Sequence, residues 1–492
     1  MSDVDLDTFD EHGFERMRAR LQQSLAALDE LLRRPGFGVG PRTLGAELEL
    51  FLIDDQGHPM ARNAEVRERV ADPRLTLEVD RFNLEGNLTP VALSGRPFAA
   101  MRTEMDELVA TVARSAADLG GGVVAIGTLP TLGAGDLGAA AVTAEPRYEA
   151  LDRRLAVLRR QPYRIDIAGN EHLVAQATDV SLEGANTSFQ LHVRSDPAHF
   201  VDTYNAAQIA TGPVLAIAGN SPYFLGHDLW DETRIALFKQ SVDHRDDLAK
   251  RVMPSRVSFG GRWLEHSALE LFADAVRTHE PLLVALSDED PRAAVHVDTV
   301  PRLDELRAHL GSVWTWNRAV YDPEAGGHLR VELRALPAGP STLDMAANGA
   351  FLLGLTLAIA EDAGTWTQLL AIEQARDNFY RAAQDGLDAV LLSPSGRTGV
   401  EPVPARDLAL RLLDPARAAL DAAGVEAADV DPLFAVLEGR ITSGRTGARW
   451  QRTTVAALEP QLGRERALVA MTQRYIDAAG TGAPVHTWPL PH

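Results

Sequence analysis

The stretch LGAELELFLI at residues 44–53 alternates between two kinds of side chain. Side chains point to opposite faces along a strand, so Glu47, Glu49 and Phe51 share one face and the leucines take the other. Two neighbouring carboxylates repel each other unless a cation or hydrogen-bond donors intervene, and Mg²⁺ prefers such hard oxygen ligands. The stretch therefore predicts a strand, and leaves open whether its glutamates bind a metal ion or are simply solvated.

A second stretch, residues 187–194, shows the same alternation with other polar groups. Its polar face carries Ser188, Gln190, His192 and Arg194, and its other face is apolar. Taken alone, this is the ordinary pattern of a strand with one solvent-exposed face and one face packed against the core.

A third stretch, residues 327–336, places Glu332 between Arg330 and Arg334 on one face. The three charges form either a ladder of ion pairs, or a metal-binding glutamate flanked by arginines that bind phosphate oxygens. Together the three stretches predict a sheet with helices behind it and a charged concave face in front. Such a face suits Mg-ATP chemistry, in which arginines and metal ions stabilise a transferring phosphoryl group.

The rest of the chain predicts an α+β fold with an antiparallel sheet, because strands and helices do not alternate strictly. Further strands are expected at residues 75–80 and 123–128. Helices are expected at residues 14–34, 98–119, 146–160, 200–218, 232–242 and 344–361. From residue 366 onward the pattern is helical, with breaks near 393–404. We expect a catalytic domain over residues 1–375 and a helical C-terminal region over 376–492 that packs on it.

Composition excludes several classes of function. The 492 residues carry a net charge of -21, which argues against nucleic acid and anionic membranes as partners. There is no cysteine, so disulfides, thiolate metal sites and a cysteine nucleophile are absent. Only Lys239 and Lys250 are lysines, and neither follows a glycine-rich loop. Arginines and metal ions would therefore have to hold any nucleotide phosphates.

The ends and the apolar runs predict a cytoplasmic protein. Residues 1–11 are acidic and lack the apolar segment of a secretory signal. The longest apolar run, residues 346–360, contains Asn348 and is short for a bilayer span, which favours a buried core helix.

Five short motifs in order resemble the bacterial and plant glutamate–cysteine ligases and their carboxylate–amine ligase relatives, within the glutamine synthetase superfamily. They are GAELEL at 45–50, PRY at 146–148, QLHV at 190–193, SPY at 221–223 with the following Arg234, and RVELR at 330–334. The resemblance covers about residues 44–348. It implies a glutamine-synthetase-like sheet, ATP and Mg²⁺ as cofactors, and small-molecule substrates, and it allows a homo-oligomer. The implied reaction phosphorylates a carboxylate, by family analogy the γ-carboxylate of glutamate, which cysteine or another amine then attacks.

Carried over by position, the resemblance also implies roles for individual residues. Metal ligands would be Glu47, Glu49 and Glu332, with Glu85 as a further ligand, a substrate contact or simply a turn glutamate. Nucleotide contacts would be Gln190, Arg330 and Arg334. His192 would lie at a metal ion or a nucleotide phosphate, or else be a structural histidine. Arg234 and Arg334 would bind phosphate or the substrate carboxylate, although Arg234 could equally form a surface ion pair.

The chain departs from the family pattern at GTLPT (127–131) and at Arg194, where glycine is common. These departures leave the amine open. Two other functions remain in view: a guanidino-type phosphotransferase of the same superfamily, and a non-catalytic homologue that binds a nucleotide or an amino acid.

Overall fold

The computed structural model describes residues 10–159, 161–396 and 399–491. Parts of three predicted segments, residues 1–9, 160 and 397–398, lie outside this range. The strands are β1 (Thr43–Asp54), β2 (Leu75–Leu77), β3 (Asn83–Asn87), β4 (Val91–Ala92), β5 (Gly121–Val124), β6 (Tyr163–Ala168), β7 (His172–Ala177), β8 (Phe189–Ser195), β9 (Tyr223–Phe224), β10 (His227–Asp228), β11 (Asn317–Asp322), β12 (His328–Leu333), β13 (Val390–Ser395) and β14 (Gly399–Pro404).

The helices vary widely in length, and the longest lie near the N-terminus and behind the sheet. They are α1 (Glu11–Leu32), α2 (Asn63–Val70), α3 (Pro97–Ala117), α4 (Pro146–Leu158), α5 (Ser181–Gly184), α6 (Phe200–Ala218), α7 (Thr233–Ser241), α8 (Ala249–Val252), α9 (Leu269–Thr278), α10 (Pro291–His296), α11 (Asp304–Leu310), α12 (Thr342–Ala360), α13 (Ala363–Leu369), α14 (Ile372–Asp385), α15 (Ala405–Ala422), α16 (Ala427–Ser443), α17 (Gly447–Leu462) and α18 (Arg464–Gly480).

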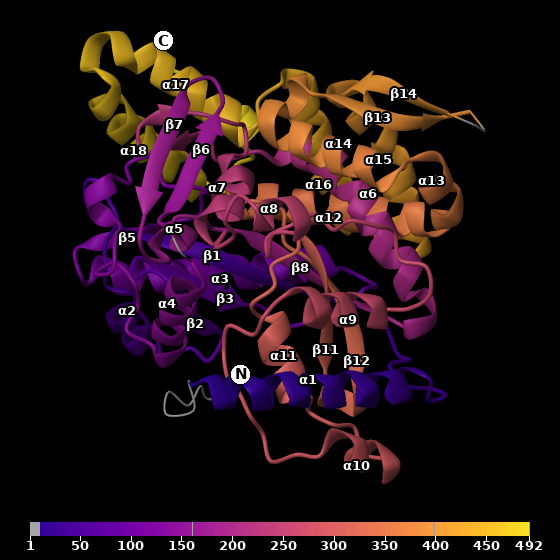
Figure 1. Cartoon of the computed structure of the whole chain (residues 1–492). Coiled ribbons are helices and arrows are strands. Elements are labelled where there is room, and N and C mark those ends of the chain that lie inside the picture. The colour runs from indigo at the N-terminus through magenta and orange to yellow at the C-terminus, as the bar shows by residue number, and fades with distance from the viewer. Residues whose placement is uncertain (1–9, 160, 397–398, 492) are drawn as a thin grey trace.

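One antiparallel sheet organises the molecule, as the alternating stretches predict (Figure 1). Its strands run in the order β11-β12-β8-β1-β3-β2, and β4 and β5 pair with the two ends of β1. The predicted strand at 75–80 ends at Leu77, and the one predicted at 123–128 is β5, which ends at Val124.

Helices α6 and α12 form the layer behind the sheet, and α15 and α16 pack against them (Figure 1). The two helices are apolar around nearly their whole circumference, which is the composition of a helix buried on all sides. Helix α12 is long and apolar enough to cross a membrane, but 83% of that window is buried inside the protein. The prediction of a core helix at 346–360 is therefore confirmed.

The chain beyond residue 375 is mostly helical, but it also holds the β13–β14 hairpin, which the sequence did not predict. The predicted division between residues 375 and 376 falls inside α14, which packs on α6. Whether the two parts are separate domains stays a prediction.

Candidate active site

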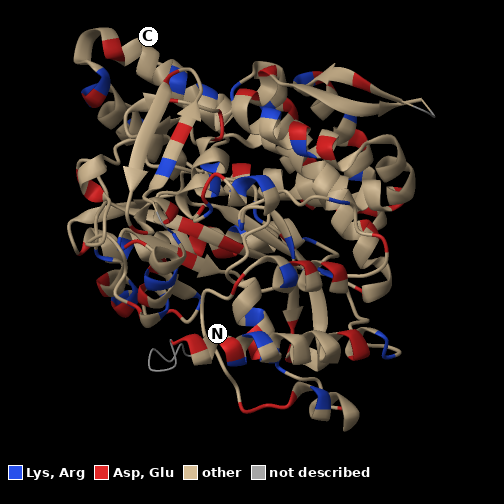
Figure 2. Cartoon of the chain, in the orientation of Figure 1, with Lys and Arg blue, Asp and Glu red and all other residues tan. Residues whose placement is uncertain are grey.

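The register of the sheet brings the predicted site residues to one face. Glu47 pairs with Gln190 across β1 and β8, and Glu49 pairs with Glu85 across β1 and β3. On the other side of β8, His192 pairs with Glu332. Directly paired residues of an antiparallel sheet point to the same side, so these side chains share the front face. Figure 2 shows acidic residues gathered on these central strands.

Glu47, His192 and Glu332 form a central row across the sheet. His192 Nε2 lies 3.0 Å from Glu47 Oε1. Glu332 Oε1 lies 2.7 Å from Arg318 Nε and 3.2 Å from Arg334 Nη1. Burial alone would raise the pKa of Glu332, but Arg318, Arg334 and His192 outweigh it and hold that pKa at about 2. Glu332 is thus charged and neutralised largely by protein groups.

A second group, which we call the acidic cluster, consists of Glu49, Glu78, Glu85 and Glu183. Burial, followed by repulsion from Glu47 and Glu49, raises the pKa of Glu85 to about 8. Burial and the charge of Glu49 likewise raise the pKa of Glu183 to about 7. The pKa of Glu78 is raised well above its usual range by burial and by Glu85, Glu49 and Glu183. Full ionisation of the cluster would therefore create more negative charge than the surrounding protein groups neutralise.

Protein donors satisfy the acidic cluster only in part. Glu49 accepts hydrogen bonds from the Ser188 backbone N–H at 2.6 Å and from Gln190 Nε2 at 3.0 Å. Glu85 accepts from Thr76 Oγ1 at 3.1 Å and from Asn87 Nδ2 at 2.9 Å. These neutral donors orient the carboxylates without cancelling their charge.

Two of the predicted arginines differ in how accessible they are. Arg334 is half-buried and contacts Glu332. Burial raises the pKa of Glu49, and the charge of Arg334 only partly offsets that rise. Arg330 lies at the edge of the face, where its Nη2 is 3.4 Å from Asp322 Oδ2. Their predicted contacts with nucleotide stay predictions.

Arg234 is buried, whereas one interpretation of the sequence placed it in a surface ion pair. It is 2% exposed, and its Nε donates to the equally buried Glu232 at 3.0 Å. Its Nη2 donates to the carbonyl oxygen of Ala335. The surface interpretation is wrong because the first turn of α7 is buried, and Arg234 there holds the backbone of the residue that follows Arg334.

Sequence reasoning missed three members of the site: Glu78, Glu183 and Arg318. Glu78 follows Thr76 by two residues at the end of β2, a period-2 signal that was available. Arg318 shares a face with Val320 and Asp322 in the edge strand β11, which was not predicted. Glu183 lies on the four-residue helix α5, too short for any periodic pattern.

The donor chemistry of the face fits magnesium, although the carboxylates are not yet gathered around a common point. Among residues 10–159, 161–396 and 399–491, no three His, Asp or Glu side chains converge as a ready metal site. Mutual repulsion within the acidic cluster is what a hard divalent cation would relieve. The buried Gln190 Oε1 also has no hydrogen-bond partner among the described residues. Metal binding through Glu47, Glu49, Glu85 and Glu332 stays a prediction.

Magnesium should stabilise the folded protein measurably. A ligand present at about 100 times its dissociation constant stabilises by about 2.7 kcal/mol. We expect the melting temperature to rise with MgCl₂ and to fall again with EDTA, while NaCl of equal ionic strength has little effect. An identical response to both salts would mean that the acidic cluster binds no divalent ion.

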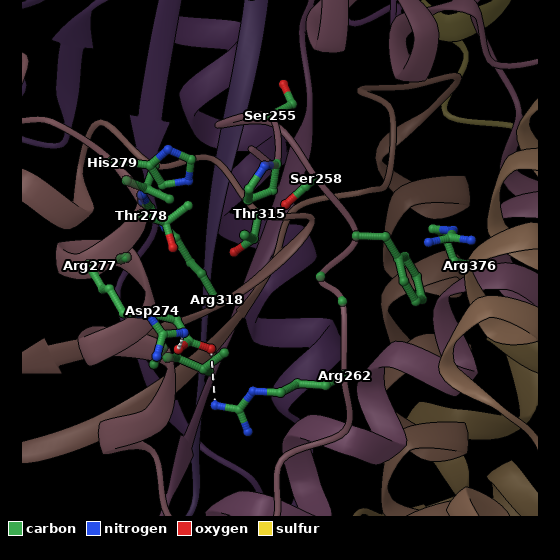
Figure 3. A pocket seen from close by; sticks show the side chains of 18 of the residues that line it. Ser255, Ser258, Arg262, Asp274, Arg277, Thr278, His279, Thr315, Arg318 and Arg376 are labelled. Carbon is green, nitrogen blue, oxygen red and sulfur yellow. Dashed lines mark hydrogen bonds and ion pairs between the residues drawn. The ribbon is translucent and has the colours of Figure 1, made fainter. Parts of the chain in front are cut away.

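A cavity of about 670 Å³ opens beside the central row, next to Arg318 (Figure 3). Its walls come from α7, α9, α14, β11 and the loops 245–262 and 310–315. Arg376 stands on one side of the cavity, and Arg277 and His279 stand on the opposite side (Figure 3).

The site therefore lies on one face of an antiparallel sheet that carries carboxylates and arginines and is backed by helices. The chain belongs to glutamate-cysteine ligase family 2, whose family model matches residues 43–470. Two curated relatives, named putative glutamate–cysteine ligase 2-2 from Mycobacterium sp. strains KMS and JLS, are each 31% identical over 147 residues. The match covers 29% of this chain and 38% of the length of each relative.

Solved structures support the fold. A glutamate–cysteine ligase from Francisella tularensis in complex with AMP superposes with a TM-score of 0.56 at 11% identity, covering 92% of this chain and 91% of that one. A bifunctional glutathione synthetase from Pasteurella multocida gives a TM-score of 0.51 at 10% identity, covering 93% of this chain and 55% of that one. At these identities the likeness establishes the shared fold alone.

Proposed function

We propose that this protein is an ATP- and Mg²⁺-dependent carboxylate–amine ligase. ATP phosphorylates a substrate carboxylate, by family analogy the γ-carboxylate of glutamate, and an amine then displaces phosphate to form an amide. One observation carries the proposal. The acidic cluster, whose charge the protein does not fully neutralise, lies beside Glu332, whose charge is neutralised by arginines. Membership of glutamate-cysteine ligase family 2 and the curated relatives support the same reaction class.

Each half of the face suits one requirement of the chemistry. Magnesium, when bound, would neutralise phosphate oxygens and draw the nucleotide and the carboxylate together. The acidic cluster and Glu47 supply carboxylates to hold it, and His192 and Glu332 extend the donor set across β8.

Arg334 is placed to stabilise the phosphoryl group during its transfer. Its guanidinium lies between Glu332 and Glu49, so it can meet the charge that develops on the transferred phosphoryl oxygens. Arg234 and Glu232 act behind it by fixing the Ala335 carbonyl. No covalent nucleophile is needed, because the attacking group in each step belongs to a substrate.

The substrates would be small molecules, and the cytoplasm remains the expected compartment. The net charge of -21 disfavours nucleic acid and anionic membranes as partners.

Arg194 donates to the carbonyl oxygens of Gly38 and Val39 and so anchors the connector before β1.

Product analysis tests the proposal. The protein is incubated with Mg-ATP, glutamate and a panel of amines that includes cysteine, and ADP, phosphate and new amides are followed by mass spectrometry. We expect an amide with ADP and phosphate in equal amounts, and none without Mg²⁺. A phosphorylated guanidine would instead identify a phosphotransferase, and nucleotide binding without turnover across the panel would identify a non-catalytic homologue.

A further inference from the structure

The C-terminal helices α17 and α18 carry fully buried polar side chains, among them Gln451 and Tyr475. None of the five motifs of the family resemblance falls on these helices, and Tyr475 lies beyond residue 470, where the match to the family model ends. A buried polar side chain costs free energy unless it is hydrogen-bonded. The partners of these two side chains therefore indicate what they do.

Both side chains bind Asn220, which follows the end of α6 and is 0% exposed. Gln451 Nε2 donates to Asn220 Oδ1 at 3.0 Å, and Asn220 Nδ2 donates to Tyr475 Oη at 2.8 Å. Tyr475 Oη in turn donates to the carbonyl oxygen of Ala125 at 2.9 Å. The orientation of the Asn220 amide is therefore set from α17 on one side and from α18 on the other.

Two glycines allow this close approach. A Cβ atom at Gly447, in the first turn of α17, would overlap Asn220 Oδ1. A Cβ atom at Gly339, where φ is 78°, would lie 2.5 Å from Tyr475 Oη and 2.8 Å from Asn220 Nδ2. Any larger side chain at either position would push these groups apart.

Asn220 holds the buried ion pair at the start of α7. Its backbone N–H donates to Glu232 Oε2 at 2.8 Å, and Glu232 Oε1 accepts from Arg234 Nε at 3.0 Å. Glu232 is 0% exposed and Arg234 is 2% exposed, so no bulk water competes for either charge. The position of Arg234 thus depends on Glu232, and the position of Glu232 depends on Asn220.

These contacts converge on the backbone that follows β12. Arg234 Nη2 donates to the carbonyl oxygen of Ala335, and Asn220 Nδ2 donates to that of Ala338 at 2.8 Å. The segment directly after Arg334 is therefore held at two carbonyl groups by side chains that share one network of hydrogen bonds.

We propose that Gln451 and Tyr475 are positioning residues for the ligase reaction. By holding Asn220 they fix the backbone that places Arg334 at the transferred phosphoryl group. The C-terminal helices thereby complete the active site without touching a substrate. The inference rests on the proposed function, because it concerns the same arginine, and it adds the part of the chain that sets the arginine's position.

Steady-state kinetics separate positioning from substrate binding. Tyr475→Phe and Gln451→Met each remove hydrogen bonds to Asn220 with little change in side-chain size. Turnover per folded molecule should fall about tenfold in each variant, which corresponds to about 1.4 kcal/mol, the size of about one net hydrogen bond. The KM values for ATP and glutamate should stay within about twofold of wild type, because the misplaced group acts on charge that develops only in the transition state.

Hydrogen–deuterium exchange gives a second measurement that needs no turnover. In the full chain without substrates, peptides that span residues 334–341 should exchange at least about fivefold faster in both variants, because local opening costs less free energy. Peptides of β1 should exchange as in wild type. Tyr163→Phe is the matched control: Tyr163 is 1% exposed, and within the described residues no hydrogen bond joins it to Asn220. It should match wild type in both measurements.

The two measurements together decide the outcome. Unchanged exchange at residues 334–341 in both variants would overturn the inference, and so would faster exchange with wild-type turnover. If wild type forms no amide with any amine, the proposed function fails. The exchange measurement then still decides whether the C-terminal helices hold the segment after Arg334.

Discussion

A glutamine at position 85 should make the protein more stable and nearly inactive. Burial and the charges of Glu47 and Glu49 raise the pKa of Glu85 from 4.5 to about 8. A carboxyl group whose pKa is raised on folding destabilises the folded state above its unfolded pKa, and the penalty grows with pH until the folded pKa is passed. The neutral amide of Glu85→Gln removes this penalty.

Denaturation in EDTA measures the effect on stability. The variant should match wild type at about pH 4.5 and exceed it by about 1–3 kcal/mol at pH 8. Turnover with Mg-ATP should fall by about two to three orders of magnitude, because a metal site worth several kcal/mol of transition-state stabilisation is weakened.

Glu107→Gln serves as the matched control, since Glu107 is an exposed glutamate on the outer side of α3. It should change neither quantity. A Glu85→Gln protein that turns over normally would remove Glu85 from the active site, and one that loses stability at pH 8 would contradict the repulsion within the acidic cluster.

Replacing Arg440 with methionine should destabilise the protein by about 3–5 kcal/mol, because the change leaves a buried carboxylate without its cation. Arg440 is 1% exposed, and its Nη2 donates to Asp344 Oδ1 at 2.6 Å. Its Nη1 donates to the Ile217 carbonyl oxygen at 3.2 Å and to Asn348 Oδ1. The guanidinium therefore joins α16 to both helices behind the sheet.

Urea unfolding compares this variant with two others. Arg440→Met combined with Asp344→Asn should recover part of the loss, because the uncompensated charge is gone. Arg411→Met, which removes an exposed partner of Glu401 at 3.7 Å, should change the free energy of unfolding by less than about 0.5 kcal/mol. If Arg440→Met and Arg411→Met lowered the free energy of unfolding equally, the buried ion pair would stabilise the protein no more than the exposed one.

The sheet and most of its front face could be predicted because their signal is local. Alternation within β1, β8 and β12 assigns Glu47, His192 and Glu332 to polar faces without any knowledge of their neighbours. That these faces coincide follows from pairing across β8, which brings together positions more than 100 residues apart. No single local pattern contains that information; the shared face was predicted from the three patterns taken together, and the register confirms it.

The missed features are those whose local signal is weak or misleading. The β13–β14 hairpin contains Pro394 and Pro402, which lower the strand propensity of both stretches. Arg234 was ambiguous for another reason: a Glu-Thr-Arg sequence at a helix start looks the same whether it is exposed or buried. Only the tertiary contacts of Arg234, which is buried against Glu232 and the Ala335 carbonyl oxygen, distinguish the two.

The contacts of Asp344 make the order of synthesis matter. Its two oxygens accept from Arg440 and from the backbone N–H of Val485, 96 and 141 residues further along the chain. While the ribosome is still translating the C-terminal helices, the start of α12 carries a carboxylate whose partners have not been made. We therefore expect the helices behind the sheet to pack stably only after the nascent chain is released. Chains truncated before Val485 should accumulate as chaperone-bound or aggregated protein.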